Sequence, residues 1–205
     1  MALAVATIDP GLPKQKRSRA RRAAMIEHGI ELLKSRDLED IPVAEITGAL
    51  GYSTGSFYSA FEDKGAFFTA AQKEVNARLA LQIEAEIETS AVTDMTPADR
   101  IALCIDFTLR LFRAYRGVIR SALRYEAKMP EAWAPNRASA QRITDGLCKG
   151  LRPADDARMR VAIQIAFGTM VNALLHDPGP LHLDDQKFAT ELKAALRPYL
   201  IHRED

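Results

Sequence analysis

The chain has 205 residues, a formal net charge of +1 and 47% hydrophobic residues, enough to build one large domain or two smaller ones. Its two cysteines lie far apart, which argues against a disulfide framework and for a reducing cytosol. The apolar start "MALAVATI" is too short to span a membrane, and positive charges follow it instead of preceding it. We therefore expect a cytoplasmic protein without a membrane segment, in which residues 1–13 form a flexible tail.

A basic segment at residues 14–22, "KQKRSRARR", is the strongest electrostatic feature of the sequence. It holds six basic residues and no acidic one, whereas residues 23–64 hold three basic and eight acidic residues. Positive charge this compact can lie along the phosphate backbone of a nucleic acid. A solvated tail, or a patch for another polyanion, explains the same composition.

The first three predicted helices form a helix-turn-helix pattern. Apolar residues in 19–35 recur at spacings of three and four, which is typical of one buried helix face. A second short helix follows Pro42, and Gly51 supplies the turn that ends it. Together with the stretch that comes next, these segments make three helices, two of them joined by a tight turn.

The stretch "GYSTGSFYSAFEDK", residues 51–64, predicts the start of the third helix. Ser53 is a good N-cap, and Phe57 and Phe61, four residues apart, can anchor the helix inward. Its small, uncharged side chains would let the helix approach the floor of the major groove of DNA. Short helices rich in Ser, Thr and Gly also join larger helices in all-α proteins, so DNA recognition is one of two interpretations.

The rest of the chain, from Lys64 onward, predicts further helices and no strands. Residues 98–116 are apolar on most sides, which favours a helix in the middle of a bundle. Residues 155–175 are rich in small side chains, and residues 184–201 carry an apolar seam typical of paired helices. We expect these two segments to form a four-helix homodimer interface, with packing inside the chain as the alternative. The expected interface residues are Ala162, Ala166, Met170, Ala173, Phe188, Leu192, Ala195 and Tyr199.

Residues 24–33, "PVAEITGALGYSTGSFYSAF" and "EDKGAFFTA" resemble the tetracycline-repressor (TetR) family of bacterial transcriptional regulators. The specific resemblance is confined to residues 24–70, and the remainder matches only as an α-helical domain of suitable length. The sequence departs from the family pattern in places: Pro42 stands where a threonine is common, and Thr54 where a basic residue is frequent. The turn "RDLED" lacks a common glycine, and Glu62 adds an acid near the expected DNA face.

The resemblance implies an all-α protein with a DNA-binding domain at 14–65 and an effector-binding and dimerisation domain at 66–205. It also implies a dimeric repressor that binds double-stranded DNA at a pseudo-palindromic operator and is released by a small molecule. The residues it places at DNA are Ser53, Thr54, Gly55 and Ser56 at the recognition helix, Val43, Tyr58, Ser59 and Lys64 nearby, and Arg17, Arg19, Arg21 and Arg22 in the basic segment.

A small apolar or amphipathic effector would need a pocket in the C-terminal domain. The candidate apolar lining is Phe107, Phe112, Tyr115, Tyr125, Met129, Trp133, Phe167 and Met170, and the candidate polar residues are Arg124, Gln164 and His176. Plain core packing is the alternative for each of them.

The sequence shows no sign of an enzyme. The four histidines show no metal-binding spacing, and there is no nucleophile elbow, phosphate-binding loop or dinucleotide fingerprint. We therefore expect no catalytic residue, metal ion or cofactor, and we expect Cys104 to fill the core. The rival to a DNA-binding regulator is a helical ligand- or partner-binding protein that no longer reads DNA.

Overall fold

The computed structural model of the chain describes residues 14–125 and 131–201, which are helical almost throughout and contain no β-strand. The elements at the N-terminal end are α1 (Lys14–Leu32), the 3₁₀ helix η1 (Leu38–Asp40), α2 (Val43–Gly48) and α3 (Thr54–Tyr58). The others are α4 (Lys64–Glu86), α5 (Ser90–Thr93), α6 (Pro97–Ala114), α7 (Arg116–Tyr125), α8 (Ala134–Cys148), α9 (Pro153–Leu175) and α10 (Lys187–Leu200). The all-α prediction is confirmed. None of the helices in the described ranges is long and apolar enough to cross a membrane.

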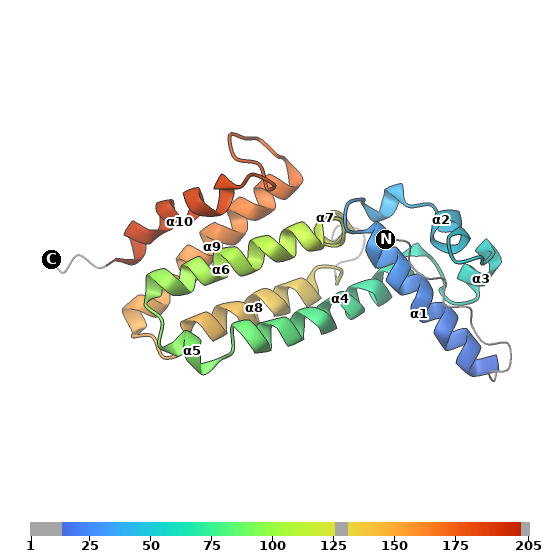
Figure 1. The fold of residues 1–205 in the computed structure, drawn as a ribbon, viewed down its shortest axis with the longest axis horizontal. Coiled ribbons are helices and arrows are strands. Elements are labelled where there is room, and N and C mark those ends of the chain that lie inside the picture. Colours follow the sequence, from blue (N-terminus) through green and yellow to red (C-terminus); the bar gives the residue numbers. More distant parts are fainter. Residues whose placement is uncertain (1–13, 126–130, 202–205) are drawn as a thin grey trace.

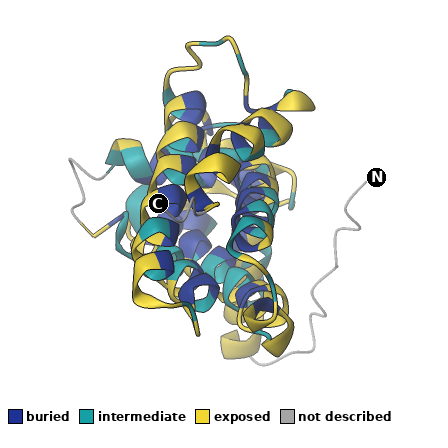
Figure 2. Ribbon diagram, turned by 90° about the vertical axis from the view of Figure 1, so that its left-hand side faces the viewer, coloured by how far each residue is buried: buried dark blue, intermediate teal, exposed yellow. Residues whose placement is uncertain are grey.

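The helices form a small N-terminal group joined to a longer bundle (Figure 1). Helices α1, α2 and α3 gather at one end, and α4 runs from that group into the bundle. In the bundle α6 packs against both α9 and α10, while α4 packs against α8. In a view turned by 90° from Figure 1, the buried residues of the bundle helices face one another (Figure 2).

Several helix ends follow from local sequence signals. Gly51 has a φ of 70°, the left-handed conformation that glycine adopts without steric cost, and it ends the turn after α2. The Asp63 carboxylate accepts a hydrogen bond of 2.7 Å from the Ala66 amide and caps α4. The Thr96 hydroxyl caps α6 in the same way, with Pro97 in the first turn.

The structure differs from the predicted helices in two places. Helix α1 begins at Lys14, not near Arg19, so the basic segment is helical. Lys, Arg, Gln and Ala are good helix formers, and the core-facing residues downstream stabilise the helix once it has started. The single helical turn α5, which follows α4, was not among the predicted helices.

Two hydrophobic cores hold the described residues together. The N-terminal core contains the ring cluster of Phe57, Phe61 and Phe67, whose centroids are 5.2 to 5.5 Å apart. The second core fills the bundle between α4, α6, α8, α9 and α10. Helix α7 belongs to both, because Val118 and Ala122 lie in the N-terminal core while other residues of α7 pack against the bundle. A movement of α7 would therefore change the packing of both cores.

Both cysteines are buried in the second core. Burial raises the pKa of the Cys104 thiol to about 12 and that of Cys148 to about 11. A thiol in this state is a poor nucleophile. The structure thus confirms Cys104 as a core residue.

Candidate nucleic-acid interface and internal cavity

The N-terminal end of α3 presents small polar groups to solvent and buries its aromatic anchors. The Ser53 hydroxyl accepts a hydrogen bond of 3.3 Å from the Ser56 amide, which caps the helix as predicted. Ser53, Thr54 and Gly55 are exposed, and 60% of Tyr58 is exposed. Because Phe57 is fully buried, the side of α3 that remains outside is the uncharged, hydroxyl-bearing side.

Three further predicted contact residues lie around α3 and differ in their exposure and in their hydrogen bonds. Ser59 is exposed, although its hydroxyl donates to the Gly55 carbonyl at 2.8 Å. Val43, the first residue of α2, is half-buried and packs against the N-terminal core. The Lys64 ammonium donates to the Glu39 carbonyl at 3.4 Å, and partial burial lowers its pKa. Lys64 is thus held beside η1, so its role as a phosphate contact stays a prediction.

Two arginines of the basic segment lie against the helix-turn-helix unit. The Arg21 guanidinium lies over the Tyr52 ring at 5.6 Å, and that of Arg22 over the Phe61 ring at 4.9 Å. Arg17 and Arg19, earlier in α1, are exposed. The fold thus brings the basic segment to the turn before α3 and to Phe61 after it, which are about thirty to forty residues away in sequence. Two positively charged side chains therefore flank the uncharged surface.

The excess of acidic residues in 23–64 is partly compensated from outside that segment. The Asp37 carboxylate pairs with Arg120 and Arg124 of α7, and Glu27 pairs with Arg78 of α4. Residue counting cannot find these pairs, since the partners are far away in the chain. The N-terminal group is therefore less negative than its own residues indicate, which favours an approach to phosphate.

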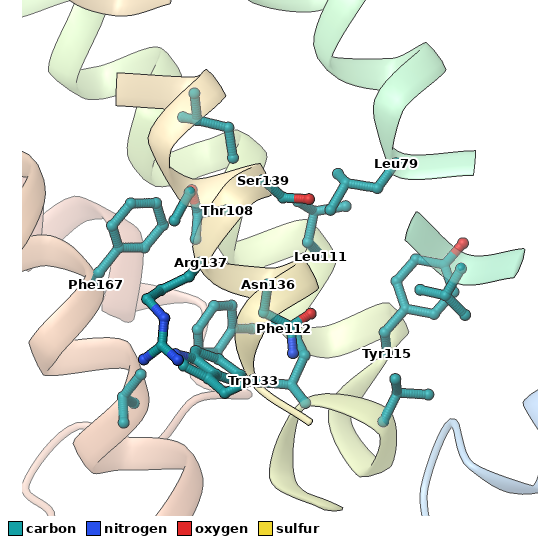
Figure 3. A pocket seen from close by; sticks show the side chains of 16 residues that line it. Leu79, Thr108, Leu111, Phe112, Tyr115, Trp133, Asn136, Arg137, Ser139 and Phe167 are labelled. Carbon is teal, nitrogen blue, oxygen red and sulfur yellow. The ribbon is translucent and has the colours of Figure 1, made fainter. Parts of the chain in front are cut away.

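An internal cavity of about 260 Å³ lies between α4, α6, α7, α8 and α9 (Figure 3). Its wall is mainly apolar and aromatic, with Leu79, Leu111, Phe112, Tyr115, Trp133 and Phe167. Thr108, Asn136, Arg137 and Ser139 add polar groups. A concave, mainly apolar space with a few polar groups is the usual form of a small-molecule site.

The structure places only part of the predicted effector set at this cavity. Phe112, Tyr115, Trp133 and Phe167 line it. The other predicted residues that the structure describes do not line it. Phe107 and Met170 are core residues, and Tyr125 packs on Phe68. Arg124 pairs with Asp37, Gln164 is exposed on α9, and His176 is exposed just after α9. The sequence pattern could not separate these groups, because it identifies an apolar helix face but not the gap between faces. Met129 lies outside the described residues.

The polar residues of the cavity wall were not predicted from the sequence. Thr108 carried a usable signal, since a polar residue stood on an otherwise apolar helix face. Asn136, Arg137 and Ser139 lie in a largely polar helix, where nothing in the spacing distinguishes residues that face a cavity from residues that face solvent. Among the described residues, no group of His, Cys, Asp or Glu side chains is placed to hold a metal ion.

Close contacts fix α7, part of the cavity wall, to the residues that follow α1 and to η1. The Leu38 amide donates a buried hydrogen bond of 2.9 Å to the Ser121 hydroxyl. Gly117 lies so near the turn after α1 that a Cβ added to it would be 2.0 Å from the Arg36 carbonyl oxygen. Together with the Asp37 ion pairs, these contacts connect the cavity wall with the N-terminal helices.

The predicted dimer interface requires a correction. Six of its residues, Ala162, Ala166, Met170, Ala173, Phe188 and Leu192, are buried inside the chain's own core. Only Ala195 and Tyr199 are exposed. The outer face of α9 instead presents Val161 and Ile165, which are 41% and 45% exposed. A spacing of three and four marks an apolar face of a helix, but it does not say whether that face meets the same chain or another one.

No family model matches the sequence, and no curated protein resembles it at a significant level. Solved structures do share the fold. A TetR-family transcriptional regulator from Streptomyces coelicolor matches with a TM-score of 0.66 and 16% identity, over 88% of this chain and 79% of that chain. A TetR transcriptional regulator from Rhodococcus sp. RHA1 matches with a TM-score of 0.54 and 19% identity, over 90% and 95%. RolR, solved with the ligand resorcinol, matches with a TM-score of 0.55 and 18% identity, over 90% and 89%. The chain therefore has the fold of the TetR-family transcriptional regulators.

Proposed function

We propose that this chain is a dimeric, ligand-responsive transcriptional regulator that binds double-stranded DNA through α3 and the basic start of α1. The observation that carries the proposal is the exposed, uncharged N-terminal end of α3 beside Arg21 and Arg22. Backbone phosphates would be bound by the arginines, and base edges in the major groove would be read by the small hydroxyl groups. A dimer would place two such surfaces on two half-sites of an operator.

The cavity provides a means of control. Val118 and Ile119 of α7 line it, and α7 is fixed to the turn after α1 by Gly117 and to η1 by Ser121. A ligand that fits the cavity better in one position of α7 would shift the population toward that position. The two α3 helices of a dimer would then change their separation, and DNA would be released. The complex of RolR with resorcinol supports the binding of a small effector within this fold.

The test of the proposed function is selection of DNA by the full-length protein from a random double-stranded library. We expect a pseudo-palindromic consensus with two half-sites about one helical turn apart. Substituting Thr54→Ala should relax the preference at individual base positions, because it removes a hydroxyl from the exposed end of α3. Retention of the library without any enriched sequence would instead favour the helical binding protein that does not read DNA.

The dimer can be tested on the outer face of α9. We expect Ile165→Glu to convert the dimer into a monomer in sedimentation equilibrium, since it places a charge in the centre of an apolar contact. Leu81→Glu is the matched control, because Leu81 of α4 is also a large exposed apolar residue, at 68%. Dissociation by both substitutions alike, or by neither, would contradict an interface on this face.

A further inference from the structure

The volume of the cavity indicates the size of molecule that would fill it. An engineered apolar cavity of about 150 Å³ binds benzene, so by proportion the 260 Å³ found here has room for about ten non-hydrogen atoms. Aromatic side chains, among them Phe112, Trp133 and Phe167, form much of the wall (Figure 3). A single ring with a short substituent fits this volume and this lining.

The charge of the cavity wall restricts the ligand further. No Asp, Glu, Lys or His lines the cavity, and the one charged lining residue, Arg137, is exposed. A cation inside would lose its hydration without meeting an opposite charge, and an anion would find its only partner at the exposed side. The interior therefore selects a neutral molecule.

Two polar atoms in this wall are buried and have no strong hydrogen-bond partner in the protein. They are Asn136 Nδ2, on α8, and Thr108 Oγ1, on α6. Thr108 has the Cys104 thiol as a neighbour, which is a weak hydrogen-bonding group, so Asn136 is the more demanding of the two. Ser139 differs from both, because its hydroxyl donates to Asn76 Oδ1 at 3.1 Å. A buried donor without a partner is costly, and a ligand oxygen would remove that cost.

We propose that the cavity binds a neutral, largely apolar molecule of about ten non-hydrogen atoms with one hydrogen-bond-accepting oxygen, which receives the Asn136 amide N–H. The Thr108 hydroxyl offers a second polar contact from the other helix. This inference rests on the proposed function in that such a molecule would be the effector. It adds the chemical class, which the fold itself does not define.

Three probes of matched size and shape test the class: acetophenone, its hydrocarbon analogue α-methylstyrene, and benzoate. Calorimetry on the full-length protein without DNA measures binding, and the indole N–H resonance of Trp133, the only tryptophan of the chain, reports whether the probe enters the cavity. We expect acetophenone to bind at least as tightly as α-methylstyrene, although its carbonyl is harder to remove from water. Benzoate should bind more weakly than either.

A substitution identifies the contact. Asn136→Leu should lower the affinity for acetophenone about tenfold relative to that for α-methylstyrene, as expected for one lost hydrogen bond to a buried donor. Ser139→Ala is the control within the same helix and the same wall, because that hydroxyl already has a protein partner. It should leave the ratio of the two affinities unchanged.

Tightest binding of benzoate, no shift of the Trp133 resonance with any probe, or an unchanged affinity ratio in Asn136→Leu would each overturn the proposed ligand class. The comparison of probes on the unsubstituted protein tests the ligand class even if Asn136→Leu does not fold. The DNA selection above is independent of these measurements. If acetophenone binds through Asn136 and no DNA sequence is enriched, the ligand class stands and the proposed regulation fails. If a DNA sequence is enriched and acetophenone does not bind through Asn136, the proposed DNA binding stands and the ligand class fails.

Discussion

Replacing Arg17 and Arg19 by glutamine should weaken operator binding by about a hundredfold and reduce its dependence on salt. Both side chains are exposed at the start of α1, on the turns that precede the arginines in contact with the helix-turn-helix unit. Each phosphate contact contributes about 0.9 to the slope of log affinity against log salt, so four lost contacts in a dimer should lower the slope by about 3.6. Fluorescence anisotropy of a labelled operator at several salt concentrations gives both quantities.

This experiment leaves Arg21 and Arg22 in place, because their contacts with Tyr52 and Phe61 also support the packing of α1. The matched control is Lys149→Gln with Lys187→Gln, which removes the same formal charge from exposed residues outside the N-terminal helices. If the control reduces the slope as much as the arginine variant does, the effect comes from net charge, and the basic segment is not a DNA contact.

Gly117→Ala should destabilise the protein by about 3 kcal/mol or more, the upper range for overpacking a rigid site. The new Cβ would lie 2.0 Å from the Arg36 carbonyl oxygen and 2.4 Å from that of Leu33. Both are backbone atoms in the turn after α1, so neither can rotate away, and α7 must move off that turn. Equilibrium unfolding in urea, followed by far-ultraviolet circular dichroism, measures the change in free energy.

Gly48→Ala is the matched control for Gly117. Gly48 is also helical, but a Cβ added there has no neighbour within 4 Å. Alanine costs less conformational entropy than glycine in a helix, so this variant should be as stable as the parent or more stable by up to about 1 kcal/mol. Equal stability of both variants would mean that α7 is not held closely against α1, and the route from the cavity to α3 would lose its support.

Local interactions explain why much of the N-terminal fold could be predicted. The cap at Ser53 and the left-handed turn at Gly51 each depend on a few neighbouring residues, and both are confirmed. The inward position of Phe57 follows from its spacing to Phe61. The early start of α1 at Lys14 was missed because exposed basic residues show no apolar periodicity, although they form helix readily.

The cavity and the outer face of α9 could not be predicted in the same way. Phe107 and Phe112 belong to the same apolar helix, yet only Phe112 reaches the cavity. Ala166 and Ile165 are neighbours in α9, but Ala166 faces the chain's own core and Ile165 faces solvent. Which face meets a gap, a neighbouring helix or solvent depends on how five helices are arranged, and that arrangement is not encoded in any single segment.

By itself the sequence determined the all-α class, the helix ends with clear caps, and the surface of α3 with its buried anchors, because these depend on contacts a few residues apart. The tertiary structure decided that Asn136 Nδ2 is buried without a hydrogen-bond partner and that Thr108 Oγ1 has only the Cys104 thiol beside it. It also decided that the Asp37 carboxylate pairs with two arginines of α7 and that Gly117 lies against the turn after α1. Burial, charge pairing and close packing are properties of atoms far apart in the chain, and only the folded arrangement brings those atoms together.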